Sequence, residues 1–184
     1  MDKSTIINNH NAKIKRILIT KEEIDSEIRK AGKMIDEMYD GRPLLLVSIL
    51  NGAFVFMADL CRAVSVPCEI AFMCAKSYSG VESTGNVSIT MDLKQDISQY
   101  HVIIVEDIVD TGRTLKEVVR ILQERNPLSL KVITLLDKPS RRVAKFDPDI
   151  ALFTIPDYFV IGYGLDCDEY FRNLPYIAEY NLDA

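Results

Sequence analysis

Continuous apolar runs alternate with amphipathic stretches along this chain. The runs predict strands, because a strand covered on both faces of a sheet is apolar at nearly every position. They occupy residues 44–50, 68–75, 101–105 and 130–136, with shorter or weaker runs at 87–91, 150–154 and 159–162. Strands that alternate with helices predict an α/β fold, a mostly parallel sheet flanked by helices on both faces.

Three amphipathic stretches predict the helices. Thr20 and Glu23 form a capping box, and apolar residues recur after it at helical spacing until residues 41–43 end the helix. A second helix is expected over residues 53–63 and a third over residues 113–124. The side chains expected to face the core are Ile24, Ile28, Ala31, Ile35 and Met38, then Phe54, Met57, Ala58 and Cys61, then Leu115, Val118, Val119 and Leu122.

Residues 76–86, KSYSGVESTGN, have no apolar period and contain two glycines and several hydroxyl side chains. This composition predicts a long loop between two strands. A loop of that kind either covers a site or simply lies on the surface, and the local pattern does not distinguish the two.

Length and composition are those of one ordinary globular domain. The chain has 184 residues, of which 48% are hydrophobic and 27% charged. The longest apolar run, residues 44–50, is too short to cross a membrane. The first ten residues lack the apolar stretch of a signal peptide, so we expect a cytoplasmic protein.

The net charge and the few cysteines and histidines argue against a nucleic-acid-binding protein and against a zinc or dithiol site. The net charge is −5 and the isoelectric point is about 5.1, which disfavours nucleic acid as a partner. The cysteines form no C-x-x-C pair, so four reduced cysteines are expected rather than a zinc or dithiol site. The two histidines are too isolated to bind zinc. These residues are Cys61, Cys68, Cys74, Cys167, His10 and His101.

Three carboxylates and a helix start follow one another in residues 102–115, VIIVEDIVDTGRTL. The apolar strand ends in Glu106 and Asp107, and Asp110 comes three residues later. A helix start presents unpaired N–H groups that attract phosphate, and Gly112 lets the backbone approach an anion closely. Carboxylates suit sugar hydroxyls or a hydrated Mg²⁺ instead. The segment therefore predicts a sugar-phosphate site at the carboxyl end of the sheet.

A helix-capping turn is the simpler alternative for this segment. It accounts for Asp110 or Thr111, but not for two further acids at the end of a buried strand, where carboxylates are costly to desolvate. Neither a Walker A loop nor a G-x-G-x-x-G motif is present. The sugar-phosphate hypothesis is therefore the better of the two.

The motif VEDIVDTGRTL resembles the phosphoribosyl-pyrophosphate (PRPP) binding motif of type I phosphoribosyltransferases. The surrounding chain resembles the hypoxanthine (hypoxanthine-guanine) branch of that family in SILNGAFVFMADL, KSYSGVESTGNV, LLDKPSRR and PDYFVIGYGLDCDEYFRNLPYI. The resemblance covers residues 20–180. It implies one phosphoribosyltransferase domain over residues 1–184, with a core at 40–155 and a small hood formed by segments 1–35 and 156–184.

The activity that the resemblance implies is a step of purine salvage. Such an enzyme transfers ribose 5-phosphate from PRPP to hypoxanthine, and to guanine, giving IMP or GMP and pyrophosphate with the help of Mg²⁺. The implied partners are these small molecules and further copies of the chain, as a homodimer or homotetramer, without nucleic acid or membrane. The alternatives are a PRPP-binding regulator without turnover and an enzyme that prefers xanthine or guanine.

The resemblance also assigns roles to individual residues. Asp110 is implied as the general base that takes the purine proton. The residues implied for PRPP and its 5-phosphate are Glu106, Asp107, Asp110, Thr111, Gly112, Arg113 and Thr114, and those for pyrophosphate are Asn51, Gly52 and Arg172. The implied closing-loop residues are Ser77 and Tyr78, the purine-binding residues are Lys138, Phe159 (or Tyr158), Val160 and Asp166, and the metal ligands are Glu106, Asp107 and Asp166.

Several of these residues have simpler explanations when the resemblance is set aside. Lys138 fits a solvated surface lysine, Val160 fits core packing, and Arg172 fits an ion pair with Asp168 or Glu169. Asn51 fits a plain tight turn.

Asn51 also departs from the family pattern. The family commonly has lysine there, preceded by a cis peptide bond. The asparagine offers an amide but no charge.

Overall fold

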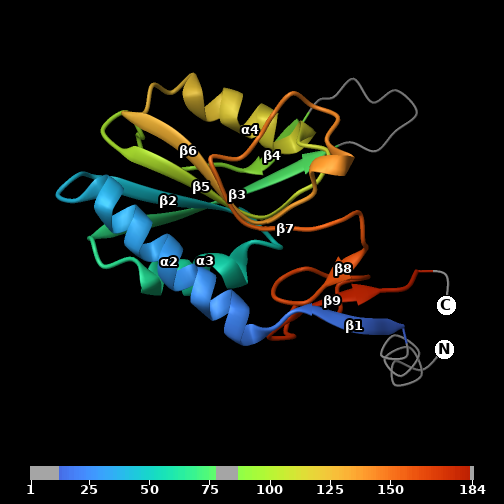
Figure 1. The fold of residues 1–184 in the computed structure, drawn as a ribbon. Coiled ribbons are helices and arrows are strands. Elements are labelled where there is room, and N and C mark those ends of the chain that lie inside the picture. The colour runs from blue at the N-terminus through green and yellow to red at the C-terminus, as the bar shows by residue number, and fades with distance from the viewer. Residues whose placement is uncertain (1–12, 78–86, 183–184) are drawn as a thin grey trace.

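The computed structural model describes residues 13–77 and 87–182 and contains a six-stranded sheet with helices on both faces (Figure 1). The strand order is β4-β3-β2-β5-β6-β7, and every neighbouring pair is parallel except β3 and β4. This confirms the predicted fold class. The strands are β2 (Leu44–Leu50), β3 (Cys68–Ser77), β4 (Val87–Met91), β5 (His101–Val109), β6 (Ser129–Asp137) and β7 (Ile150–Thr154).

Two hydrophobic layers lie against the two faces of this sheet. Helices α2 (Lys21–Tyr39) and α3 (Phe54–Ala63) cover one face, and α4 (Arg113–Gln123) covers the other (Figure 1). Strand β2 supplies both layers, since Leu44 and Leu46 belong to the first cluster and Leu45 and Val47 to the second. This alternation explains why its sequence is apolar throughout.

A smaller antiparallel sheet joins the two ends of the chain. Its order is β1-β9-β8, with β1 at Ile14–Ile19, β9 at Ile177–Tyr180 and β8 at Val160–Ile161. Figure 1 shows it beside the larger sheet. This is the hood that the resemblance implied. Helix α2, although it falls within the segment expected for the hood, packs on α3 in the larger layer.

The capping box of α2 forms as predicted. The side chain of Thr20 accepts a hydrogen bond from the backbone of Glu23, and Glu23 accepts one from the backbone of Thr20. The buried face agrees with the prediction: Met38 at its end is partly buried against the core, and Tyr39 is buried in addition.

Other expectations for the helices and strands were wrong in part. In α3 the buried side chains are Phe56, Met57 and Leu60, whereas Phe54 is 44% exposed, because the helix begins at Phe54 and turns it outward. In α4, Val119 is only partly buried. Strand β3 continues through residues 76 and 77, which were expected in the loop, and residues 78–86 lie outside the described part of the chain.

Strand β5 is longer than its apolar run. It continues to Val109 and so includes Glu106 and Asp107, which were expected just after it. The extension is possible because β6 pairs with β5 along its whole length, up to Val109 opposite Asp137. The two acids therefore lie on a hydrogen-bonded strand rather than on a loop.

All four cysteines are free and partly buried, as expected. In the described ranges 13–77 and 87–182, no helix has the length and apolar character needed to cross a membrane.

Candidate active site

A cavity of about 230 Å³ opens where β5 ends and α4 begins. It is formed at the carboxyl edge of the parallel sheet, where ligands bind in folds of this kind. Glu106 and Asp107 come from β5, Leu50 and Gly52 come from the end of β2, and the turn at residues 110–114 closes one side. The structure thus brings together the acids and the helix start that the motif predicted.

The turn at residues 110–114, here called the phosphate turn, leads into α4. Gly112 is the N-terminal cap of the helix and has φ +75°, a left-handed conformation that glycine adopts without strain. The N–H groups of the first helical turn have no carbonyl partner within the helix and lie next to the cavity. The phosphate turn therefore offers amides and the hydroxyls of Thr111 and Thr114 to an anion.

Residues 142–144 hydrogen-bond to the backbone of the phosphate turn and hold it in place. The carbonyl of Thr111 accepts hydrogen bonds from the backbone N–H groups of Val143 (3.0 Å) and Ala144 (2.9 Å). Arg142 Nη1 donates to the carbonyl of Asp110 at 2.7 Å, and its Nη2 pairs with Asp137 at the end of β6. No role was expected for Arg142 from the sequence alone. The pair of arginines in the block LLDKPSRR was the available signal.

Hydrogen bonds and nearby positive charges do not fully compensate the burial of the Glu106 and Asp107 carboxylates. Glu106 Oε2 is buried and has no hydrogen-bond partner among the described residues, and burial together with the charge of Asp107 raises the pKa of Glu106 well above its ordinary value. Burial raises the pKa of Asp107 to about 6, although the Ile108 N–H and the charge of Arg172 act in the opposite direction. Two neighbouring acids of this kind favour a bound cation or hydrogen-bond donors.

Asp110 lies at the edge of the cavity with one oxygen held and one free. Its Oδ1 accepts a hydrogen bond from Arg141 Nε at 3.0 Å, and its side chain is 40% exposed. Its Oδ2 accepts no hydrogen bond from the described residues. An oriented carboxylate with a free oxygen is suited to accept a proton.

Lys138 is buried rather than solvated, which contradicts its simpler explanation as a surface lysine. The side chain is 7% exposed, and its Nζ donates to the carbonyl of Tyr158. Burial lowers the pKa of Lys138, while the nearby charges of Asp110 and Asp157 act against that change. The hydrogen bond joins the end of β6 to the segment that leads into the hood.

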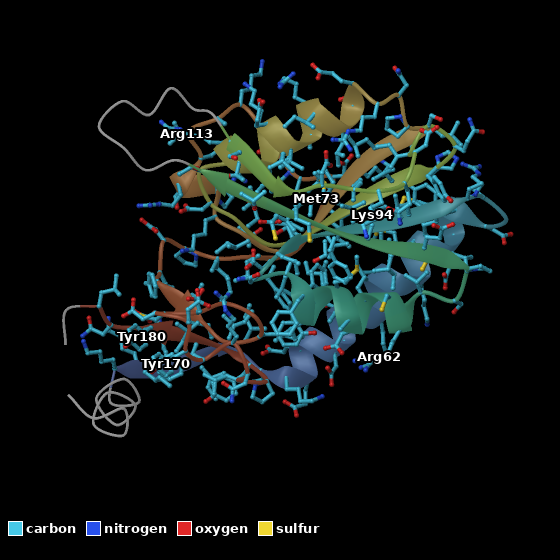
Figure 2. All side chains as sticks on the ribbon, turned by 180° about the vertical axis from the view of Figure 1, so that it is seen from behind. Arg62, Met73, Lys94, Arg113, Tyr170 and Tyr180 are labelled. Atoms are coloured by element: carbon cyan, nitrogen blue, oxygen red, sulfur yellow. The ribbon has the colours of Figure 1, made fainter. Side chains whose placement is uncertain are left out.

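The residues predicted to hold the purine base lie on that segment. Phe159 is 40% exposed, and its ring centroid lies 6.0 Å from that of Tyr180. The side chain of Val160 is buried in β8, so only its backbone is available to a ligand. Figure 2 shows Tyr180 within the small sheet, so the ring of Phe159 lies beside that sheet.

Arg172 and Asp166 form an ion pair at 2.9 Å, and Arg172 also pairs with Glu169. Arg172 Nη1 also donates to the carbonyl of Gly164, whose backbone lies against that of Gly52 in the cavity wall. The expected pairing with Glu169 is therefore present, and the guanidinium is also tied to the residue that touches Gly52.

The loop at the end of β2 has the backbone form that the resemblance implied. The peptide bond between Leu50 and Asn51 is cis. The side chain of Asn51 is exposed, while Gly52 lies so near Asp107 that a Cβ there would meet its Oδ2 at 1.5 Å. Gly52 rather than Asn51 lines the cavity.

Some predicted site residues lie elsewhere. The side chain of Arg113 is exposed and lines a separate groove along α4, and Figure 2 shows it at the outer surface. Only its backbone belongs to the phosphate turn. Ser77 ends β3, and Tyr78 falls in residues 78–86, outside the described part of the chain.

The acids fit a divalent cation that keeps several waters. No group of three histidine, cysteine, aspartate or glutamate side chains in residues 13–77 and 87–182 is arranged to hold a metal alone. The unpartnered oxygen of Glu106 beside Asp107 nevertheless matches Mg²⁺, which proteins bind through one or two carboxylates together with substrate oxygens.

Comparisons with known proteins agree with this geometry. A family model for the phosphoribosyl transferase domain matches residues 13–168. The chain is 48% identical over 166 residues to hypoxanthine phosphoribosyltransferase of Salmonella typhimurium, covering 89% of this chain and 93% of that protein. It is 45% identical over 166 residues to hypoxanthine-guanine phosphoribosyltransferase of Streptococcus pneumoniae, covering 90% and 92%. A crystal structure of hypoxanthine phosphoribosyltransferase from Staphylococcus aureus matches with a TM-score of 0.90 and 43% identity, covering 93% and 94%.

Proposed function

Since the chain belongs to the phosphoribosyltransferase family, we propose that it transfers the 5-phosphoribosyl group of PRPP to hypoxanthine, and to guanine, and releases pyrophosphate. The observation that carries this proposal is the cavity itself. It has amides and hydroxyls on the side of the phosphate turn and the acids of β5 on the other, a combination that suits a phosphorylated sugar. The relatives named above carry the same activity in their names.

The phosphate turn binds the 5-phosphate, and the acids of β5 bind the sugar. Glu106 and Asp107 accept hydrogen bonds from the ribose hydroxyls, which supply the donors that Glu106 Oε2 lacks. When Mg²⁺ is bound, it neutralises the charge of the pyrophosphate group. Glu106, Asp107 and Asp166 are the residues that hold it, directly or through water.

Asp110 acts as the general base. The purine nitrogen forms a bond to the anomeric carbon of the ribose as the bond from that carbon to pyrophosphate breaks, and the nitrogen's proton moves to Asp110 Oδ2. Positive charge develops at the anomeric carbon in the transition state, and a nearby carboxylate stabilises it. Arg141 holds Oδ1 at 3.0 Å and so leaves the second oxygen for the proton.

Lys138 selects the base. Its ammonium donates to the 6-oxygen of hypoxanthine or guanine, whereas the 6-amino group of adenine offers no acceptor. Phe159 stacks on the ring, and the backbone of Val160 contacts the edge of the base. The partial exposure of Phe159, 40%, fits a ring that a ligand covers.

The pyrophosphate lies between the loop after β2 and the hood. Gly52 contributes its backbone, and Arg172 contributes a guanidinium that matches phosphate oxygens in a bidentate manner. Asn51 supplies an uncharged amide where the family commonly has a cation.

One mixing experiment tests the proposal. The protein is incubated with PRPP, Mg²⁺ and hypoxanthine, guanine, xanthine or adenine in turn, and product formation is followed by ultraviolet absorbance and pyrophosphate release. Product with hypoxanthine and guanine, but not adenine, is expected. Product with xanthine alone would keep the chemistry and change the substrate, and PRPP binding without any product would favour a regulator instead.

We also propose that copies of the chain associate. Ile70 and Phe72 lie on one face of β3 and are each 41% exposed, and Phe54 at the start of α3 is 44% exposed. Ile70 and Phe72 expose apolar area side by side on β3, and such exposed apolar area favours an interface between subunits. Sedimentation velocity should give a dimer or tetramer, and Phe72→Arg should shift it toward monomer.

A further inference from the structure

We propose that Tyr163 and Asp59 are positioning residues that set the distance between the two halves of the pyrophosphate site, the loop after β2 and the hood. The inference rests on the proposed function, because it takes Gly52 and Arg172 as the residues that hold pyrophosphate. The Tyr163–Asp59 contact lies outside the cavity, and it controls how tightly Gly52 and Arg172 bind pyrophosphate.

The contact is a hydrogen bond between the hood and α3. Tyr163 follows β8 and is 4% exposed, and its hydroxyl donates to Asp59 Oδ2, 104 residues away in the sequence. Burial and the neighbouring carboxylate raise the pKa of Tyr163, so the hydroxyl keeps its proton. The bond is partly buried, and a hydrogen bond to a charged acceptor is stronger than one between neutral groups.

The residue after Tyr163 touches the loop after β2. Gly164 has φ +99°, and a Cβ there would lie 2.0 Å from the carbonyl oxygen of Gly52. The backbones of Gly164 and Gly52 are therefore in direct contact. Only glycine fits at this approach.

Gly164 is also bonded to Arg172. Its carbonyl accepts a hydrogen bond from Arg172 Nη1 at 2.8 Å, and its N–H donates to the carbonyl of Arg172 at 2.9 Å. The position of Gly164 thus determines the position of the guanidinium. Any movement of residue 164 away from Gly52 would move Arg172 with it.

Asp59 provides the fixed end of this arrangement. It lies on α3, which begins at Phe54, two residues after Gly52. The hydroxyl of Tyr163 therefore joins the loop that carries Arg172 to the helix that directly follows Gly52. Apolar contacts hold the same regions together, since Tyr163 and Leu165 pack in one cluster with Phe56 and Leu60. Loss of the hydroxyl should therefore loosen the site without unfolding the hood.

Tyr163→Phe tests the inference, because it removes only the hydroxyl. We expect the KM for PRPP and the dissociation constant for magnesium pyrophosphate to rise about tenfold, equivalent to about 1.4 kcal/mol. The KM for hypoxanthine should change less than about twofold, because the purine contacts come from Lys138 and the segment after β7. Asp59→Ala should reproduce this pattern, Asp59→Asn should be milder because its amide oxygen can still accept, and Tyr163→Phe combined with Asp59→Ala should be no worse than either alone.

Two matched controls separate this role from general effects. Within the described part of the chain the buried hydroxyl of Tyr39 has no hydrogen-bond partner, so Tyr39→Phe removes the same atom from the core and should leave all three constants unchanged. Arg62 forms an ion pair with the other carboxylate oxygen of Asp59, and Figure 2 shows Arg62 at the surface. Arg62→Gln should likewise leave the three constants unchanged.

The inference fails if Tyr163→Phe binds magnesium pyrophosphate as tightly as the original protein in calorimetry. It also fails if the KM values for PRPP and hypoxanthine rise together, which would indicate a structural role only. Should Tyr163→Phe not fold, Asp59→Ala decides by the same criteria. The proposed function fails separately, if the unchanged protein gives no product with any purine.

Discussion

Replacing Asp107 with asparagine should stabilise the ligand-free protein. Burial raises the pKa of Asp107 from 3.8 to about 6. A carboxyl with a higher pKa in the folded state binds more protons when folded, so stability is lost as the pH rises from about 4 to 6. Since one pKa unit corresponds to about 1.36 kcal/mol, the loss reaches about 3 kcal/mol at pH 8.

Asparagine removes the charge and keeps the local bond. Its side-chain oxygen can still accept from the Ile108 N–H, which lies 2.7 Å from Asp107 Oδ1. Asp107→Asn should therefore gain up to about 3 kcal/mol in the free energy of unfolding at pH 8 and almost nothing at pH 4. Urea unfolding in the presence of a chelator measures both values.

Asp147→Asn is the matched control, because the side chain of Asp147 is 92% exposed. It should change stability little at either pH. Equal gains for Asp107→Asn at pH 4 and pH 8, or no gain at pH 8, would refute the reasoning. In catalysis the same variant should lose at least about tenfold in kcat/KM for PRPP, since even outer-shell partners of metal ligands contribute that much.

Three further substitutions test other parts of the site. Asp110→Asn should lower kcat at least ~10²-fold with little change in Tm, and unchanged turnover would remove the general-base role. Lys138→Ala should raise the KM for hypoxanthine more than that for PRPP in steady-state kinetics, and equal effects would count against recognition of the base. Gly164→Ala should raise the KM for PRPP, because its Cβ would lie 2.0 Å from the carbonyl oxygen of Gly52, and an unchanged KM would contradict the close approach.

The larger sheet was predictable because local signals and tertiary packing agree there. Strand β2 has the predicted bounds, since its apolar run lies between a proline and an Asn-Gly turn. Helix α2 was marked at its start by the capping box of Thr20 and Glu23.

The strands of the hood had no comparable local signal. Strand β1 is paired with β9, whose residues are more than 150 positions away, and its sequence IKRILI mixes charged and apolar residues. The charged side chains of β1 form ion pairs with a residue far away in the sequence, since Lys15 and Arg16 both pair with Glu179. Pairing between distant segments determines these strands, and short-range patterns do not report it.

The residues of the candidate site also fall into two groups, those that a local motif predicts and those that only tertiary contacts bring into place. The residues proposed to touch substrate, such as Asp107 and Asp110, could be predicted because their motif is continuous in sequence. Supporting residues were missed, because Arg141 bonds to Asp110 and Tyr163 bonds to Asp59 only once the fold brings these partners near. Support of this kind depends on tertiary contacts and not on a local pattern.

The predicted end of β5 was wrong, but the same sequence feature identified Glu106 and Asp107 as candidate site residues. An apolar run that stops at Val105 predicted the end of the strand, yet pairing with β6 continues through Val109. Glu106 and Asp107 thus occupy strand positions that burial would fill with apolar side chains, and the raised pKa of Asp107, about 6, reflects that conflict. A sequence selected for stability alone would not keep them there, so the local break in the apolar pattern marks the place where binding, rather than packing, determines the residue.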